Sequence, residues 1–363
     1  MTGRLKKDYR ACSYALASCV LGLIFMRLFV YFVPFPSETY GQSLIGSAVF
    51  SIGTQIIFFF AVPFCIYKFY GGKSTKNVLE FSSCGKFKPR FLLALPLGIA
   101  VYVLTVGVSS AWSALLDFTG YNVTSSSVPM PDEFVFGYFV TDMLLTALLP
   151  AFCEEFCMRG GVLTTAQSSF KKIGCILFCG IAFGLFHQNI RQVFYTSLFG
   201  ALAAYLTIEM KSLYPAMIMH FTNNFCSVFF DYATHYEWGF LGGFHPALNG
   251  MNVGGLMLVF LGTGAFAVLI VVVMLYLRDK QIIETKREVL KDAAFDATNK
   301  RVVLMGEFDP ERVSRLEMEK EVYGADYERA LCKPCARDIM IAVALGVVAL
   351  CTTVFTYVWG FFY

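Results

Sequence analysis

Three short groups of polar side chains interrupt apolar stretches of this sequence. The first is a pair of adjacent carboxylates, Glu154 and Glu155, with Arg159 following in the same run. Adjacent side chains on an α-helix point about 100° apart, whereas side chains related by i, i+4 share a face and can form an ion pair. We therefore expect Glu155 to pair with Arg159, and Glu154 to be left without that partner and free to face a cavity as the reactive group. The alternative is a run of interfacial charges that anchors a helix end.

The second and third groups add donors and acceptors that acid–base chemistry also needs. His187 ends an apolar run, and His220 and Asn224 lie i, i+4 apart within another, so that their side chains project into the same space. Alternatively, His187 is an ordinary histidine at the membrane interface, and His220 and Asn224 form hydrogen bonds between packed helices. Asn223 is expected to do no more than pack. Ionisable side chains within a membrane are costly and therefore indicate function.

Long apolar runs are the elements that must position these groups. A helix needs about 20 mostly apolar residues to cross a bilayer. Nine apolar runs are candidates for such helices, although some are shorter or contain polar groups. They are Cys12–Val33, Ile45–Tyr67, Phe91–Leu116, Phe136–Phe156, Ile173–Phe186, Val193–Ile208, Tyr214–Phe230, Leu256–Leu277 and Ile339–Phe362. The three polar groups lie at the end of the fourth run, at the end of the fifth run and inside the seventh.

The composition supports a membrane protein. Of the 363 residues, 57% are hydrophobic and 15% are charged, whereas a soluble domain has about 25% charged residues. A water-soluble enzyme of this length could not bury so much apolar surface. Most of the 12 cysteines lie inside the apolar runs, where they are typical of small buried residues. We therefore predict an all-α fold, a polytopic transmembrane bundle of about eight core helices followed by a charged segment and a ninth helix.

Charge is concentrated near the C-terminus. Residues 278–338 hold 27 of the 55 charged side chains, although the net charge is only +3. We divide the chain into a membrane core (1–277, with the motifs in 136–230), a charged segment (278–338) and a terminal helix (339–363). Lys and Arg are concentrated in alternate short loops, which predicts a cytoplasmic N-terminus, a cytoplasmic charged segment and an outside C-terminus. The charged segment offers a surface to a cytosolic or membrane protein partner, and we expect no nucleic-acid partner.

In this order, the polar groups resemble the motifs of the CAAX-protease and bacteriocin-processing (CPBP, or Abi) family of membrane proteins, whose relatives include the type II CAAX prenyl endopeptidases. The family pattern is E-E-x-x-x-R, then F-x-x-x-H, then H-x-x-x-N. It stands here as Glu154, Glu155 and Arg159, then Phe183 and His187, then His220 and Asn224.

The resemblance implies a glutamate-dependent intramembrane endopeptidase that cleaves a membrane-associated protein or peptide without a cofactor. Glu154, helped by His187, would hold and deprotonate a water molecule, and His220 and Asn224 would donate hydrogen bonds to the oxyanion. Three further residues would support them: Glu155, Arg159 and Phe183.

Two other readings of the same residues stay open. Glu154, His187 and His220 could form a His₂Glu zinc site, although the H-E-x-x-H signature of many metalloproteases is absent. The same polar pocket could instead bind a partner in a transporter or in a scaffold, immunity or regulatory protein without proteolysis. Serine and aspartyl intramembrane proteases are disfavoured, because the sequence has neither a G-x-S-x-G elbow nor a pair of aspartyl motifs.

Overall fold

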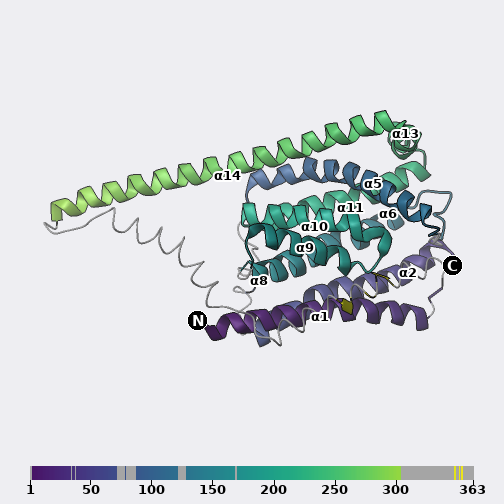
Figure 1. Ribbon diagram of the computed structural model, residues 1–363, viewed down its shortest axis with the longest axis horizontal. Helices are drawn as coiled ribbons and strands as arrows, with labels where there is room; N and C mark the ends of the chain where they lie inside the picture. The colour runs from purple at the N-terminus through teal and green to yellow at the C-terminus, as the bar shows by residue number, and fades with distance from the viewer. Residues whose placement is uncertain are drawn as a thin grey trace.

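The structure, a computed structural model, describes most of the chain. It covers residues 2–33, 35–36, 38–71, 78, 87–121, 128–167 and 170–303, together with residues 347–348, 351 and 353–354. Every regular element within these ranges is a helix and none is a strand, so the predicted all-α fold is confirmed. Figure 1 shows the helices running roughly along one axis, with the N-terminus and α8 at one end of the bundle and α13 at the other.

Six helices within the described ranges are long and apolar enough to cross a membrane, which makes the chain an integral multi-pass membrane protein. Two of them consist of several consecutive helical elements, which we call the second helix and the motif helix. The second helix comprises α2 (Tyr40–Ser51), η1 (Ile52–Ala61), α3 (Val62–Cys65) and η2 (Ile66–Tyr70). The motif helix comprises α6 (Phe136–Asp142), η4 (Met143–Leu148), α7 (Leu149–Glu155), η5 (Phe156–Leu163) and α8 (Thr164–Ala166).

The remaining helices complete the bundle. They are α1 (Thr2–Phe32), η3 (Pro89–Leu93) with α5 (Ala94–Phe118), α9 (Lys172–Phe186), α10 (Ile190–Met210), α11 (Tyr214–His235), the short α12 (Gly239–Gly242) and α13 (Phe244–Gly250), and α14 (Val253–Val303). Each of the first eight predicted runs therefore falls on a helix. Of these, α9 has only 15 residues, and α11, which contains the polar run from His220 to Asn224, is not among the six most apolar spans.

The predicted end of the fourth run at Phe156 is wrong. The motif helix continues to Ala166, so that the two glutamates lie inside a membrane-spanning helix rather than at its end. In the sequence, Arg159 interrupts the apolar residues shortly after Phe156. In the structure, however, Arg159, Gly160 and Gly161 are all buried, and Arg159 is neutralised by an ion pair.

Wide π-helical turns leave backbone carbonyls available to side chains of other helices. In the second helix, the N–H of Val62 bonds to the carbonyl of Ile57, and Pro63 has no N–H to offer. The Phe58 carbonyl instead accepts hydrogen bonds from Ser18 Oγ (3.3 Å) and Cys19 Sγ (3.4 Å) of α1. The irregular turn thereby joins the second helix to α1.

Glycine permits the close approach of α9 to α10. A Cβ atom on Gly184 would lie 2.5 Å from the backbone oxygen of Val193, and one on Gly180 would lie 2.8 Å from that of Ser197. No rotamer change can relieve contacts with backbone atoms. The pair therefore forms a tight antiparallel hairpin, and its turn carries His187.

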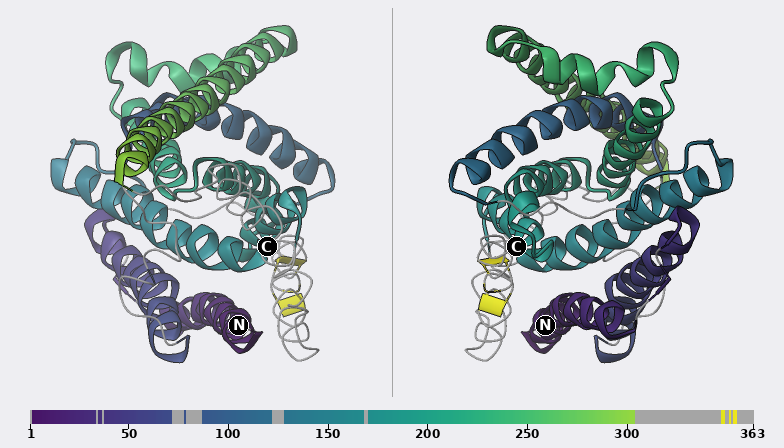
Figure 2. Two further views of the ribbon diagram at one scale, coloured as in Figure 1. Left: turned by 90° about the vertical axis from the view of Figure 1, so that its left-hand side faces the viewer. Right: turned by 90° about the vertical axis from the view of Figure 1, so that its right-hand side faces the viewer.

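The charged segment begins as a continuation of the last core helix. Helix α14 continues to Val303 and extends well past the other helices (Figures 1 and 2). Polar contacts hold it to the core near this point: Arg278 pairs with Glu209 of α10, which also pairs with Lys172 of α9, and Arg90 donates to Gln281. Residues 304–338 of the segment lie outside the described residues, as does most of the predicted ninth helix. Of that helix, Val348 packs beside a cluster built from α1, the second helix, the motif helix and α9.

We predict that Gly184→Val separates α9 from α10 and lowers the free energy of unfolding by about 1–3 kcal/mol, the usual cost of overpacking a core. Unfolding in SDS-containing mixed micelles measures the change. Gly262→Val on α14 is the matched control, because a Cβ atom there meets nothing within 4 Å. Equal destabilisation by the two variants would contradict the proposed close packing.

Candidate active site

A buried group of charges joins the motif helix to α11. Arg159 Nη1 donates to Glu155 Oε1 at 2.9 Å, so the expected i, i+4 pair is confirmed. His220 Nδ1 lies at the same distance, 2.9 Å, from the same carboxylate oxygen. Glu155 and Arg159 are fully buried, and His220 is 5% exposed. One carboxylate thus neutralises a guanidinium and orients an imidazole from another helix.

Phe183 lies at the centre of this group. The guanidinium of Arg159 lies over its ring at 4.3 Å, and its edge-to-face contacts reach both His220 and His187, with centroids 6.0 and 4.8 Å apart. Arg159 Nη2 also donates to the backbone oxygen of Gly200 on α10 at 3.2 Å. The supporting residues named by the motif therefore form one packed unit.

His187 directly follows α9, as the sequence predicted, and its orientation is fixed locally. Its Nδ1 lies 2.8 Å from the carbonyl oxygen of Phe183, one of the carbonyls that a helix end leaves without a backbone partner. Because a carbonyl only accepts, Nδ1 carries the proton, and Nε2 of the neutral ring is an acceptor. The carboxylate of Glu154 and the ring of His220 both act electrostatically on this imidazole.

The turn that carries His187 is held from two sides. Arg27 of α1 donates to the backbone oxygens of His187 (3.0 Å) and Gln188 (3.3 Å). Trp112 Nε1 of α5 donates to the backbone oxygen of Ile190 at 2.7 Å. Gln188 has a left-handed backbone (φ 49°), which closes the turn within a few residues. Neither Arg27 nor Trp112 belongs to the sequence motifs.

Asn224 is oriented by a chain of hydrogen bonds. Thr105 Oγ1 donates to Asn223 Oδ1 (3.2 Å), and Asn223 Nδ2 donates to Asn224 Oδ1 (3.0 Å). Asn224 Nδ2 then donates to the backbone oxygen of Thr146 at 3.0 Å. Thr146 lies in the π-helical stretch η4, directly before α7. Asn223, expected only to pack, therefore fixes the amide of its neighbour.

Glu154 has a partner that the sequence analysis missed. Gln55 Nε2, from η1 of the second helix, donates to Glu154 Oε1 at 2.7 Å. Glu154 is 7% exposed and Gln55 is 8% exposed, and Glu154 Oε2 has no hydrogen-bond partner among the described residues. Glu154 lacks Arg159 as a partner, as expected, but one of its oxygens is held by Gln55. An isolated polar residue within the second apolar run was the only signal for Gln55 in the sequence.

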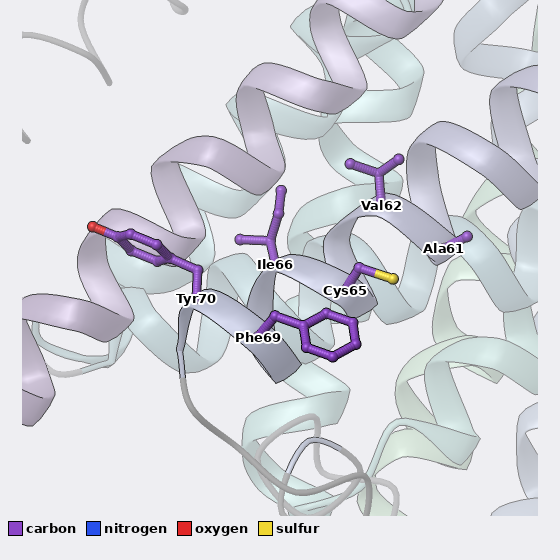
Figure 3. Close-up of a pocket in the computed structure, with 6 residues that line it drawn as sticks. All are labelled: Ala61, Val62, Cys65, Ile66, Phe69 and Tyr70. Carbon is purple, nitrogen blue, oxygen red and sulfur yellow. The ribbon is translucent and has the colours of Figure 1, made fainter.

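The candidate residues therefore come from three separate parts of the bundle, the motif helix, the α9–α10 turn and α11. Within the described residues, no group of three His, Cys, Asp or Glu side chains is arranged to hold a metal ion. A hollow of about 390 Å³ lies elsewhere, on the second helix, lined by Ala61, Val62, Cys65, Ile66, Phe69 and Tyr70 (Figure 3). Apart from the Tyr70 hydroxyl, its lining is apolar, and it includes none of the candidate site residues.

The fold and the site define a class of protein: a polytopic membrane protein with two buried carboxylates, one buried imidazole and a second, partly buried imidazole. Residues 136–226 match the family model described as "Type II CAAX prenyl endopeptidase Rce1-like". The match spans the motif helix and most of α11, and it confirms the family resemblance that the motifs predicted. The match supports the assignment of the chain to CAAX-type intramembrane proteases in general. Neither the curated proteins nor the solved structures gave a match.

We predict that Arg159→Met lowers the free energy of unfolding by about 3–5 kcal/mol, because it leaves the buried Glu155 carboxylate without its ion pair. Unfolding in SDS-containing mixed micelles again gives the change. The matched control is Arg191→Met, whose pair with Asp117 (3.1 Å) is partly exposed and contributes about 0–1 kcal/mol. A loss for Arg159→Met no larger than that of the control would show that the buried pair does not stabilise the bundle.

Proposed function

We propose that the chain is an intramembrane endopeptidase that hydrolyses a peptide bond of a membrane-associated protein or peptide. The observation that carries the proposal is the buried Glu154 carboxylate, which has one oxygen held by Gln55 and the other without a partner among the described residues. It lies in the region of the family match, one residue from the carboxylate that orients His220. A buried carboxylate with an available oxygen is suited to hold and deprotonate water.

His187 provides a second acceptor for the same water molecule. Its Nδ1 is engaged by the Phe183 carbonyl, so Nε2 is the nitrogen that can accept a hydrogen bond. In this proposal the water donates one hydrogen bond to Glu154 and one to His187. Two acceptors fix the direction of the oxygen lone pair that attacks the scissile carbonyl.

His220 and Asn224 are the proposed donors to the oxyanion. Because Nδ1 of His220 donates to Glu155, donation from Nε2 requires the protonated imidazolium. Asn224 uses one hydrogen of Nδ2 for the Thr146 carbonyl, and the other is available. Fixed donors of this kind stabilise a tetrahedral intermediate most strongly where water is excluded.

The proposed reaction then has two steps. The water oxygen attacks the carbonyl carbon while its proton passes to Glu154, and the carbonyl oxygen becomes an oxyanion that accepts hydrogen bonds from His220 and Asn224. The C–N bond then breaks, the proton on Glu154 passes to the leaving amine, and a carboxylic acid is released with it. Glu154 returns to its ionised form, so that no cofactor is consumed.

We also propose the orientation in the membrane. Figure 1 places the N-terminus, α8 and the far end of α14 at one end of the molecule. Lys171 and Lys172 follow α8 closely at this end, so the excess of positive charge assigns it to the cytoplasm. Residues 278–338 are then cytoplasmic and available to a protein partner, and the C-terminus lies outside.

We predict that Glu154→Gln lowers kcat by about 10²–10⁴, the usual contribution of a general base, and that Asn224→Leu lowers it by about 10²–10³, the usual cost of one oxyanion donor. The measurement uses the full chain in proteoliposomes and a fluorogenic peptide that ends in a prenylated C-a-a-X sequence. The same peptide without the prenyl group shows whether the lipid is required. Glu209→Gln is the control, since Glu209 pairs with Lys172 and Arg278 outside the candidate site.

Cleavage that persists in Glu154→Gln would contradict the proposed mechanism. Activity that a chelator removes and zinc restores would instead support a metalloprotease. Absence of cleavage by the wild-type chain, together with binding of a membrane partner that depends on Glu154 and His187, would support the scaffold or transporter reading.

A further inference from the structure

Gln55 is the one described side chain that donates a hydrogen bond to Glu154, and it comes from outside the residues that match the family. It lies on η1, a π-helical stretch in the second helix, where Gly53, Thr54 and Gln55 are all buried. Such stretches are frequent at functional sites because they redirect side chains. The uncharged amide of Gln55 therefore lies beside the proposed base.

The donor and acceptor atoms of this contact follow from the charge of Glu154. An ionised carboxylate only accepts hydrogen bonds, so the amide must present Nε2, as it does at 2.7 Å. The carbonyl oxygen of Gln55 is then left buried, without a hydrogen-bond partner among the described residues. The amide therefore uses its donor end on the carboxylate, and its acceptor end plays no part in the contact.

The same contact can persist when Glu154 has taken the proton of the attacking water. In the proposed reaction that proton arrives on Oε2, so Oε1 of the neutral carboxyl group remains an acceptor for Nε2 of Gln55. Leucine or methionine offers no donor, and lysine brings a charge. A glutamine side chain can therefore hold the proposed base in both protonation states without bringing a charge into the membrane.

We propose that Gln55 is a positioning residue for Glu154, holding the carboxylate through Nε2 so that Oε2 faces the water. This inference rests on the proposed function, since it assumes that Glu154 is the base. It extends the site to the second helix, so the catalytic unit includes more than residues 136–226.

Other titratable groups also surround Glu154, and the test must separate their effects from that of Gln55. On its own helix these are the thiols Cys153 and Cys157 and the Glu155–Arg159 pair. From α9 and α11 they are His187 and His220. None of these is altered by a substitution at Gln55, so a change in the titration of Glu154 reports on the amide itself.

The experiment is an infrared pH titration of the full chain in lipid nanodiscs, in which the carboxyl band of Glu154 is identified by its absence from Glu154→Gln. In Gln55→Met we expect this band to titrate about one to two pH units higher than in the wild type, because the ionised form has lost a hydrogen bond to a charged group. The acid limb of the peptidase pH profile should move in the same direction, with a fall in kcat and little change in KM.

Thr54→Val is the matched control. Thr54 is a buried polar neighbour on the same helix, and its hydroxyl bonds to the Phe50 and Ser51 carbonyls rather than to the site. In Thr54→Val, the titration of the Glu154 band and the pH profile of the peptidase activity should equal those of the wild type. Should Gln55→Met fail to fold, Gln55→Asn keeps the amide but is one methylene too short to hold the contact, and should shift the band in the same direction.

A Glu154 band that titrates at the wild-type pH in the folded Gln55 variant would overturn the role of Gln55. A shift of the same size in Thr54→Val would overturn it equally, since any disturbance of the second helix would then suffice. The infrared measurement needs no substrate. A wild-type chain that cleaves nothing would therefore overturn the proposed function, whereas an unshifted band in an active enzyme would overturn only this inference.

Discussion

The arrangement of the bundle depends on the cost of burying ionised side chains among apolar helices. A polar group without a partner inside a membrane costs several kcal/mol, and Glu155 and Arg159 are both fully buried. Each partner of Glu155 lies on a specific helix, Arg159 on its own and His220 on α11. Satisfying one carboxylate therefore brings together the motif helix and α11, and through Gly200 also α10. The contacts that orient the site are thus contacts that hold the bundle together.

Backbone carbonyls provide the second set of links. Three backbone carbonyls accept hydrogen bonds from side chains: Phe58 and Thr146 in π-helical stretches, and Phe183 at the end of α9. Their donors are a serine and a cysteine of α1, Asn224, and His187. Pro63 removes the backbone N–H that would reach Phe58, and a helix end leaves its last carbonyls without a backbone donor. In two of the three cases the acceptor orients a residue of the candidate site.

The two adjacent glutamates have different surroundings although they are neighbours in sequence. Glu155 lies between two cationic or protonatable groups, whereas Glu154 contacts an amide and keeps one oxygen without a partner among the described residues. Charge neutralisation suits a structural carboxylate, and an available oxygen suits a base. Helices outside the family match contribute to this difference, since Gln55 is on the second helix and Arg27 of α1 holds the turn that carries His187.

The sequence by itself determined the features that depend on local spacing. Hydropathy located the first eight helices, and the helical period identified the Glu155–Arg159 pair and placed His187 at the end of α9. The tertiary structure alone decided the partners of Glu154, His220 and Asn224, and the extension of the motif helix past Phe156. Gln55 is 99 residues from Glu154, and Glu155 is 65 residues from His220. Helical periodicity describes only one helix at a time, so contacts at such separations are set by how the helices pack.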